Sequence, residues 1–108
     1  MARYLIFGSC DPLEANDTAR CYDVAASLAK EGHSVTFFLV QNGVFPARRN
    51  ARSRALAALT GANVTVLADE FSLRERGITT DRMAAGVKAA PLDVVIDHLA
   101  EGAKTFWH

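Results

Sequence analysis

The sequence predicts an α/β protein built on one doubly wound, mostly parallel sheet of five strands with helices on both faces. Three observations indicate this fold: five short apolar runs recur along the chain, segments with helical spacing separate them, and 50% of the 108 residues are hydrophobic. Strands that alternate with helices of about 10–15 residues favour right-handed crossovers and parallel pairing. The layout is flavodoxin-like, and we expect a single domain over residues 1–108.

The predicted strands are runs of apolar, β-branched and aromatic residues. Arg3 to Gly8 is a short, largely apolar run that ends in glycine, as in a central strand covered on both faces. The run from Ser34 to Val40 is rich in β-branched and aromatic residues, which favour strands. The predicted strands span residues 3–8, 34–40, 63–68, 86–90 and 104–107.

The predicted helices lie between these runs. Asp17 or Thr18 can cap the first one, whose apolar residues recur at i, i+3, i+4 and i+7, and Gly32 provides the left-handed residue that ends it. Two further helices are predicted over residues 47–59 and 92–99, and a short helical turn at Thr80 or Asp81. The intervening segments 41–43 and 69–80 are predicted as a turn and a loop.

The charge balance gives no indication of a nucleic-acid or membrane partner. Twelve Lys and Arg residues offset twelve Asp and Glu residues, so the formal net charge is zero. Four arginines gather at positions 48, 49, 52 and 54, but no aromatic residues are interleaved with them as stacking platforms. No apolar run approaches the ~20 residues that span a bilayer, and no secretory leader is evident. We therefore expect a cytoplasmic protein, and a near-neutral surface favours self-association.

The cysteines and histidines form no metal-binding pattern. Cys10 and Cys21 are expected to stay reduced thiols in a cytoplasmic chain. The three histidines are far apart in the sequence, and no Cys-x-x-Cys, His-x-x-x-His or EF-hand motif is present. We expect neither a metal site nor a cofactor.

Three loops follow the predicted strands at the edge where parallel sheets place their ligands. They are Ser9 to Asn16, Gln41 to Pro46, and Asp69 to Thr80. In open α/β sheets, chemistry lies beyond the carboxyl ends of the strands. We therefore expect the candidate functional residues in these three loops.

Several segments, in order and spacing, resemble the DsrE/DsrF-like family of sulfur-relay proteins. These segments are Gly-Ser-Cys-Asp-Pro, Phe-Phe-Leu-Val-Gln-Asn-Gly-Val, Gly-Ala-Asn-Val-Thr-Val-Leu, Arg-Gly-Ile-Thr, Ala-Gly-Val-Lys and Lys-Thr-Phe-Trp. The resemblance covers nearly the whole chain. It implies a cytoplasmic homotrimer or homohexamer that passes persulfide sulfur between proteins, with a sulfur-donor or sulfur-acceptor protein as partner.

The family's loop has the form Cys-x-x-x-Arg-Gly-Ile/Leu, and its cysteine holds the persulfide. Arg76, Gly77 and Ile78 match this form, but Ser72 stands at the cysteine position. A serine hydroxyl forms no persulfide, because the sulfur carrier is a thiolate. Ser72 is then either a polar loop residue without a catalytic role or a nucleophile of another kind, which would need an adjacent general base.

Cys10 is the other candidate sulfur carrier. It follows the first strand at the functional edge and precedes a helix whose dipole favours an anion. The adjacent Asp11 opposes this by raising the pKa of the thiol, and a structural thiol is the alternative. Cys21, on the core face of the first helix, is interpreted as a packing residue.

Polar residues of the three loops are the predicted ligand contacts. Arg76 either steadies an anionic ligand or pairs with a local carboxylate to hold its loop, while Gly77 allows the turn. The predicted contacts are Ser9, Asp11, Asn42, Arg74, Arg76 and Gly77.

Two functions of different classes follow. The protein is a sulfurtransferase-like carrier or a subunit of a persulfide relay, or it is a non-catalytic oligomeric module that binds a small ligand or a protein. Hydrolysis with Ser72 as nucleophile ranks behind both.

Overall fold

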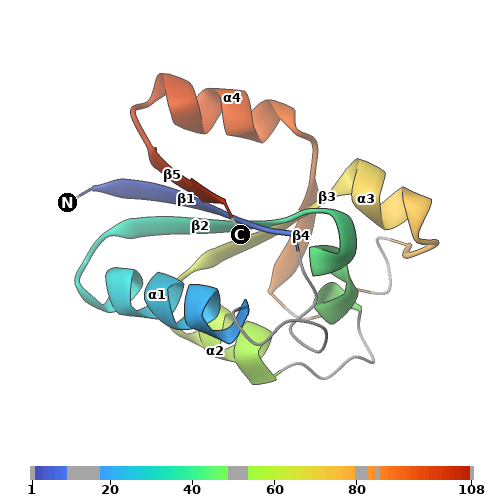
Figure 1. Cartoon of the computed structure of the whole chain (residues 1–108), viewed down its shortest axis with the longest axis horizontal. Coiled ribbons are helices and arrows are strands. Elements are labelled where there is room, and N and C mark those ends of the chain that lie inside the picture. The colour runs from blue at the N-terminus through green and yellow to red at the C-terminus, as the bar shows by residue number, and fades with distance from the viewer. Residues whose placement is uncertain (1, 10–17, 49–53, 80–82, 85, 108) are drawn as a thin grey trace.

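A single parallel sheet forms the centre of the protein. The computed structural model describes residues 2–9, 18–48, 54–79, 83–84 and 86–107. Five strands pair in the order β4-β3-β2-β1-β5, and all four pairings are parallel. Their bounds are β1 Arg3–Gly8, β2 Ser34–Leu39, β3 Thr65–Asp69, β4 Val87–Ala90 and β5 Lys104–Trp107. The predicted five-stranded parallel α/β fold is confirmed (Figure 1).

Central strands are apolar on both faces because helices cover both. β1 pairs with β2 and with β5, and its last four residues are buried. In the register, Phe37 lies between Ile6 and Val66 on one face, whereas Phe7 lies beside Phe38 on the other. A continuous apolar run therefore indicated a central strand correctly.

Helices α1 (Thr18–Lys30) and α2 (Arg54–Gly61) cover one face, and α4 (Asp93–Ala100) covers the other (Figure 1). The face under α1 and α2 holds the larger core cluster, with Phe37 and Leu59 among its buried members. The α4 face holds a smaller cluster around Leu5 and Phe38.

Two short helices occupy the carboxyl edge, where the sequence predicted irregular segments. The predicted turn at 41–43 is part of a 3-10 helix, η1 (Gln41–Ala47), and the predicted loop 69–80 contains helix α3 (Glu70–Glu75). Asp69 caps α3 by accepting a hydrogen bond from the backbone N–H of Ser72. This satisfies an N–H that lacks a partner within the helix and lets six residues form a helix.

The second predicted helix starts later than its apolar spacing suggested. Arg48 has extended backbone, and it forms an isolated antiparallel bridge with Met83. Ala47 accepts a backbone hydrogen bond from Ala84 at 2.6 Å. These long-range contacts override the helical pattern at residues 47 and 48. The helical turn predicted at Thr80 or Asp81 lies outside the described residues.

Candidate functional site

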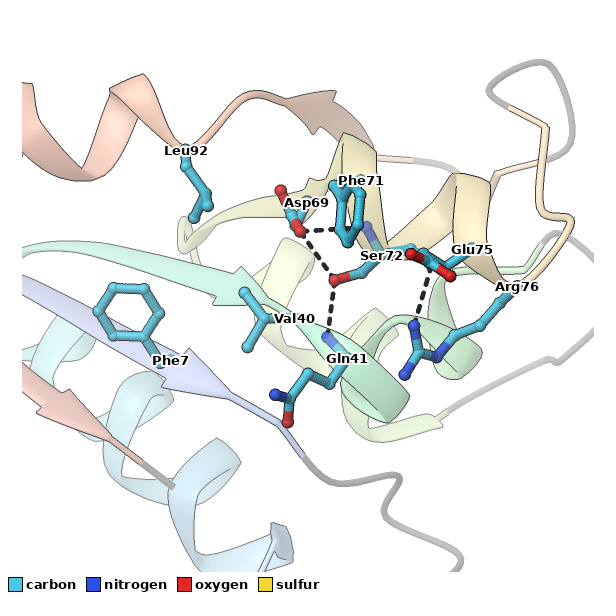
Figure 2. Close-up of a pocket in the computed structure, with 9 residues that line it drawn as sticks. All are labelled: Phe7, Val40, Gln41, Asp69, Phe71, Ser72, Glu75, Arg76 and Leu92. Atoms are coloured by element: carbon cyan, nitrogen blue, oxygen red, sulfur yellow. Dashed lines mark hydrogen bonds between the residues drawn. The ribbon is translucent and has the colours of Figure 1, made fainter.

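A cleft of about 410 Å³ opens at the carboxyl edge of the sheet, between the ends of β1, β2 and β3, helix α3 and the start of α4 (Figure 2). Its volume lies within the range of small-molecule pockets. Apolar and polar side chains line it together: Phe7, Val40, Gln41, Asp69, Phe71, Ser72, Glu75, Arg76 and Leu92.

Ser72 lies in the first turn of α3 and is buried, with 4% of its surface exposed. Its hydroxyl donates to Oδ2 of Asp69 at 2.7 Å and accepts from the backbone N–H of Gln41 at 2.8 Å (Figure 2). The hydroxyl proton is therefore held by a carboxylate and one lone pair by an amide. Ser72 joins α3 to the end of β2, and it is not a loop residue.

Gln41 has a left-handed backbone, with φ of +51°, which is strained for a residue with a side chain. The hydroxyl of Ser72 holds its N–H in this conformation. The side-chain amide of Gln41 extends away from Ser72 toward the end of β1 (Figure 2). The strained turn thus places an amide group at the mouth of the cleft.

Arg76 connects the same two segments from the other side. Its Nε donates to Oδ1 of Asn42 at 3.1 Å, and its Nη1 donates to the backbone oxygen of Ser72 at 3.3 Å. The guanidinium also lies 6.0 Å from the centre of the Phe45 ring. Arg76 therefore holds η1 against α3 through neutral acceptors, and it pairs with no carboxylate of the described residues.

The structure brings together three of the residues singled out in the sequence: Ser72, Asn42 and Arg76. Gly77 follows them with a φ of +67°, the left-handed conformation that the turn after α3 requires. Arg74 is exposed on α3 and does not line the cleft.

Residues of the first loop are placed less fully. Ser9 is half-buried directly after β1, at the same edge of the sheet. Cys10 and Asp11 lie outside the described residues. The edge itself is closed between β1 and β2, because a side chain at Gly43 would overlap the carbonyl oxygen of Gly8.

Sequence reasoning missed Asp69 and Gln41 as members of the site. The signal for Asp69 was present, since an aspartate directly after a strand and three residues before Ser72 matches an N-cap. Nothing local indicated the strained backbone of Gln41, because its N–H donates a hydrogen bond to a residue 31 positions away.

Cys21 is a packing residue, as predicted. It is half-buried on α1 against the larger core cluster, and burial raises the pKa of its thiol. Within the described residues, no three His, Cys, Asp or Glu side chains gather as metal ligands would. None of the helices in that part of the chain has the length and apolar character needed to cross a membrane.

The chain matches the model of the DsrE/DsrF-like family over residues 3–107. It belongs to this family. The resemblance seen in the sequence is thereby confirmed, and the DsrE/DsrF-like match extends from the first strand to the last. Among curated proteins, none is significantly similar in sequence.

Solved structures share the DsrE-like fold. The YchN protein of E. coli superposes with a TM-score of 0.83 at 21% identity, covering 99% of this chain and 98% of its own. MTH1491 of Methanobacterium thermoautotrophicum, a protein of unknown function, gives 0.78 at 20% identity over 100% of both chains. BT1422 of Bacteroides thetaiotaomicron, also of unknown function, gives 0.74 at 14% identity, covering 98% and 94%. At these identities the likeness shows the fold alone.

Proposed function

We propose that this DsrE-like protein serves a persulfide sulfur relay as a binding subunit, and that its cleft holds a ligand or partner segment without carrying sulfur on α3. The family resemblance supports the sulfur-relay context. Cytoplasmic location and assembly as a homotrimer or homohexamer belong to the same proposal.

The state of Ser72 supports this proposal most directly. The hydroxyl is buried, and both its proton and one lone pair are used in structural hydrogen bonds. A nucleophile must present its reacting atom to a substrate, with a base that takes its proton. Asp69 accepts that proton, but it also caps α3, and the two residues are only 5% and 4% exposed at the base of the cleft. The geometry favours a structural role over hydrolysis.

The charge beside Ser72 points the same way. Asp69 Oδ2 lies 2.7 Å from the Ser72 hydroxyl oxygen. A persulfide anion at this position would face a carboxylate at contact distance in a partly desolvated site, which strongly disfavours the anion. The α3 site is therefore poorly suited to sulfur carriage even by a thiol.

The competing hypothesis is that Cys10 carries the sulfur. It is supported by the position of Gly8, where β1 ends beside the carboxyl end of β2, at the edge of the sheet where the cleft lies. The chain should be incubated with glutathione persulfide and its intact mass measured with and without reductant. We expect no stable gain of sulfur. A gain of about 32 Da that Cys10→Ser abolishes and Cys21→Ser preserves would overturn the binding role and make the chain a carrier.

A further inference from the structure

The polar groups of the cleft differ in whether they are free to meet a ligand. Asp69, Glu75 and Arg76 are its charged lining residues. The guanidinium of Arg76 donates from Nε to the amide of Asn42 and from Nη1 to the carbonyl of Ser72, and because both acceptors are neutral it keeps its positive charge. Glu75 is exposed, and it has no ion pair among the described residues. Two carboxylates against one guanidinium give the lining of the cleft a formal charge of −1.

Asp69 contributes a second carboxylate at the base of the cleft. The residue is 5% exposed, and both hydrogen bonds from Ser72 go to the same oxygen, Oδ2. Its Oδ1 accepts no hydrogen bond within the described part of the chain. Figure 2 shows this oxygen directed away from Ser72, on the side where Leu92 lies. A carboxylate oxygen that faces the cleft without a protein donor can accept a hydrogen bond from a ligand.

Apolar walls flank these carboxylates. Phe71 and Leu92 are 62% and 54% exposed, which is unusual for large apolar side chains, and Phe7 and Val40 form the inner wall. The face of a phenyl ring attracts a cation, and aliphatic walls favour a hydrocarbon stem. The amide of Gln41 adds an acceptor at the mouth.

From these features we propose that the cleft binds an organic cation, a primary ammonium or guanidinium group on a hydrocarbon stem. The inference rests on the proposed binding function and names its ligand class. The stem packs between Phe71 and Leu92, and the charged head donates to Asp69 Oδ1 and pairs with Glu75. A free amine and a lysine or arginine side chain of a partner protein share this chemistry.

Three probes of one shape but different charge test the inference: phenethylamine, 2-phenylethanol and phenylacetate. Each is titrated into ¹⁵N-labelled protein, and the backbone amide shifts of Gln41, Ser72 and Glu75 are followed. We expect the amine to bind with a Kd of about 1 mM, at least about tenfold more tightly than the other two. Blocked lysine amide, used as a fourth probe, distinguishes a side-chain source from a free amine.

Two variants assign the charge contacts. Asp69→Asn keeps a good helix cap and should weaken amine binding about tenfold, whereas the exposed Glu75→Gln should weaken it about twofold. Asp23→Asn, an exposed carboxylate on α1, is the matched control and should change nothing. The fold of each variant is checked by the dispersion of the same spectra.

Equal binding of the three probes, no binding of any, or full amine affinity in Asp69→Asn would overturn the cation assignment. None of these results touches the mass measurement that tests the binding role. A sulfur gain at Cys10 would overturn that role while leaving the probe titrations to be judged by themselves.

Discussion

The two faces of the sheet differ in how well they are covered. Among the described residues, two helices, α1 and α2, cover one face over a cluster of fifteen buried residues. In the same part of the chain the other face is covered by α4, over a cluster of five, and α4 has no buried residue. Leu92, Ile96 and Leu99 stay about half exposed or more along this helix. Packing is concentrated on the first face, whereas apolar surface remains available on the second.

The cleft opens toward the thinly covered face. Its inner wall, Phe7 and Val40, consists of members of the smaller cluster, and Leu92 begins the exposed stripe of α4. The polar residues at the base of the cleft are instead anchored to the face under α1 and α2, because Leu73, next to Ser72, belongs to the larger cluster. A binding site is favoured where well-packed residues at the base of a cleft meet apolar side chains that remain exposed.

The largest expected effect is on the free energy of unfolding, and it is tested by the same phenylalanine-to-alanine substitution made once under α1 and α2 and once at the cleft. Phe37→Ala, in the larger cluster with no exposed surface, should lower the free energy of unfolding by about 3–5 kcal/mol. Phe71→Ala, at the cleft mouth, should lower it by less than about 0.5 kcal/mol. Urea denaturation followed by circular dichroism measures both. Similar losses would mean that stability is not concentrated under α1 and α2.

A charge on the exposed side of α4 should weaken self-association without lowering the free energy of unfolding. Ile96→Asp places a carboxylate in the exposed stripe, where Ile96 is 66% exposed. A homotrimer or homohexamer needs an apolar surface through which its copies meet. If the exposed residues of α4 form that surface, the association constant should fall at least about thirtyfold, or 2 kcal/mol. Light scattering measures it, with Val24→Asp on α1 as control. Equal dissociation of both variants would show that the exposed residues of α4 are not the surface through which the copies associate.

Ser72→Ala tests the link between the cleft base and β2. The variant leaves the N–H of the strained Gln41 without its acceptor, and it removes a donor from Asp69. We expect a loss of about 1–3 kcal/mol in the free energy of unfolding. Ser27→Ala, exposed on α1, is the control. An unchanged denaturation midpoint would mean that water replaces the hydroxyl without cost.

Sulfur loading at position 72 should depend on Asp69. In a Cys10→Ser, Cys21→Ser background, Ser72→Cys introduces the only thiol, and the neighbouring carboxylate should raise its pKa. Adding Asp69→Asn removes the charge and should speed persulfide formation about tenfold at neutral pH. Mass spectrometry over time gives the rates. Equal rates would show that Asp69 does not control the chemistry at this position.

The smallest expected effect is on the pH dependence of stability, and it concerns Cys21 on α1. Burial raises the pKa of this thiol above its ordinary value of 9.0. Its neutral form therefore stabilises the fold fully below about pH 9, and the contribution is lost as pH rises through the higher folded-state pKa. Above pH 9, wild-type protein should lose slightly more stability than Cys21→Ala. Parallel denaturation curves at pH 7 and pH 10 compare them.

The sequence predicted the sheet well because each strand's apolar run is a local property that burial on both faces demands. β1 to β5 all lie within a few residues of their predicted positions. The three deviations are η1 in place of the turn at 41–43, α3 within the predicted loop, and the later start of α2, and all lie at the carboxyl edge. There, capping by Asp69 and the pairing of Arg48 with Met83 decide the structure, and helical periodicity does not report such contacts.

The site was predicted in position but not in organisation. The family pattern led to Ser72 and Arg76, and both lie in the cleft. Their partners Gln41 and Asn42 are 31 and 34 residues away in the chain, so only the folded sheet reveals the hydrogen bonds. The same bonds connect α3 with the end of β2 through Ser72.

The contact of Gly43 with Gly8 sets a limit on how this protein can vary. A methyl group at Gly43 would overlap the carbonyl oxygen of Gly8, which also accepts a hydrogen bond from Val40. Backbone cannot retreat from such an overlap as a flexible side chain can. In a saturation mutagenesis screen, position 43 should therefore tolerate no other amino acid and rank with catalytic residues, although it does not line the cleft. Intolerance at that site would reflect two chain segments crossing without room for a single extra carbon.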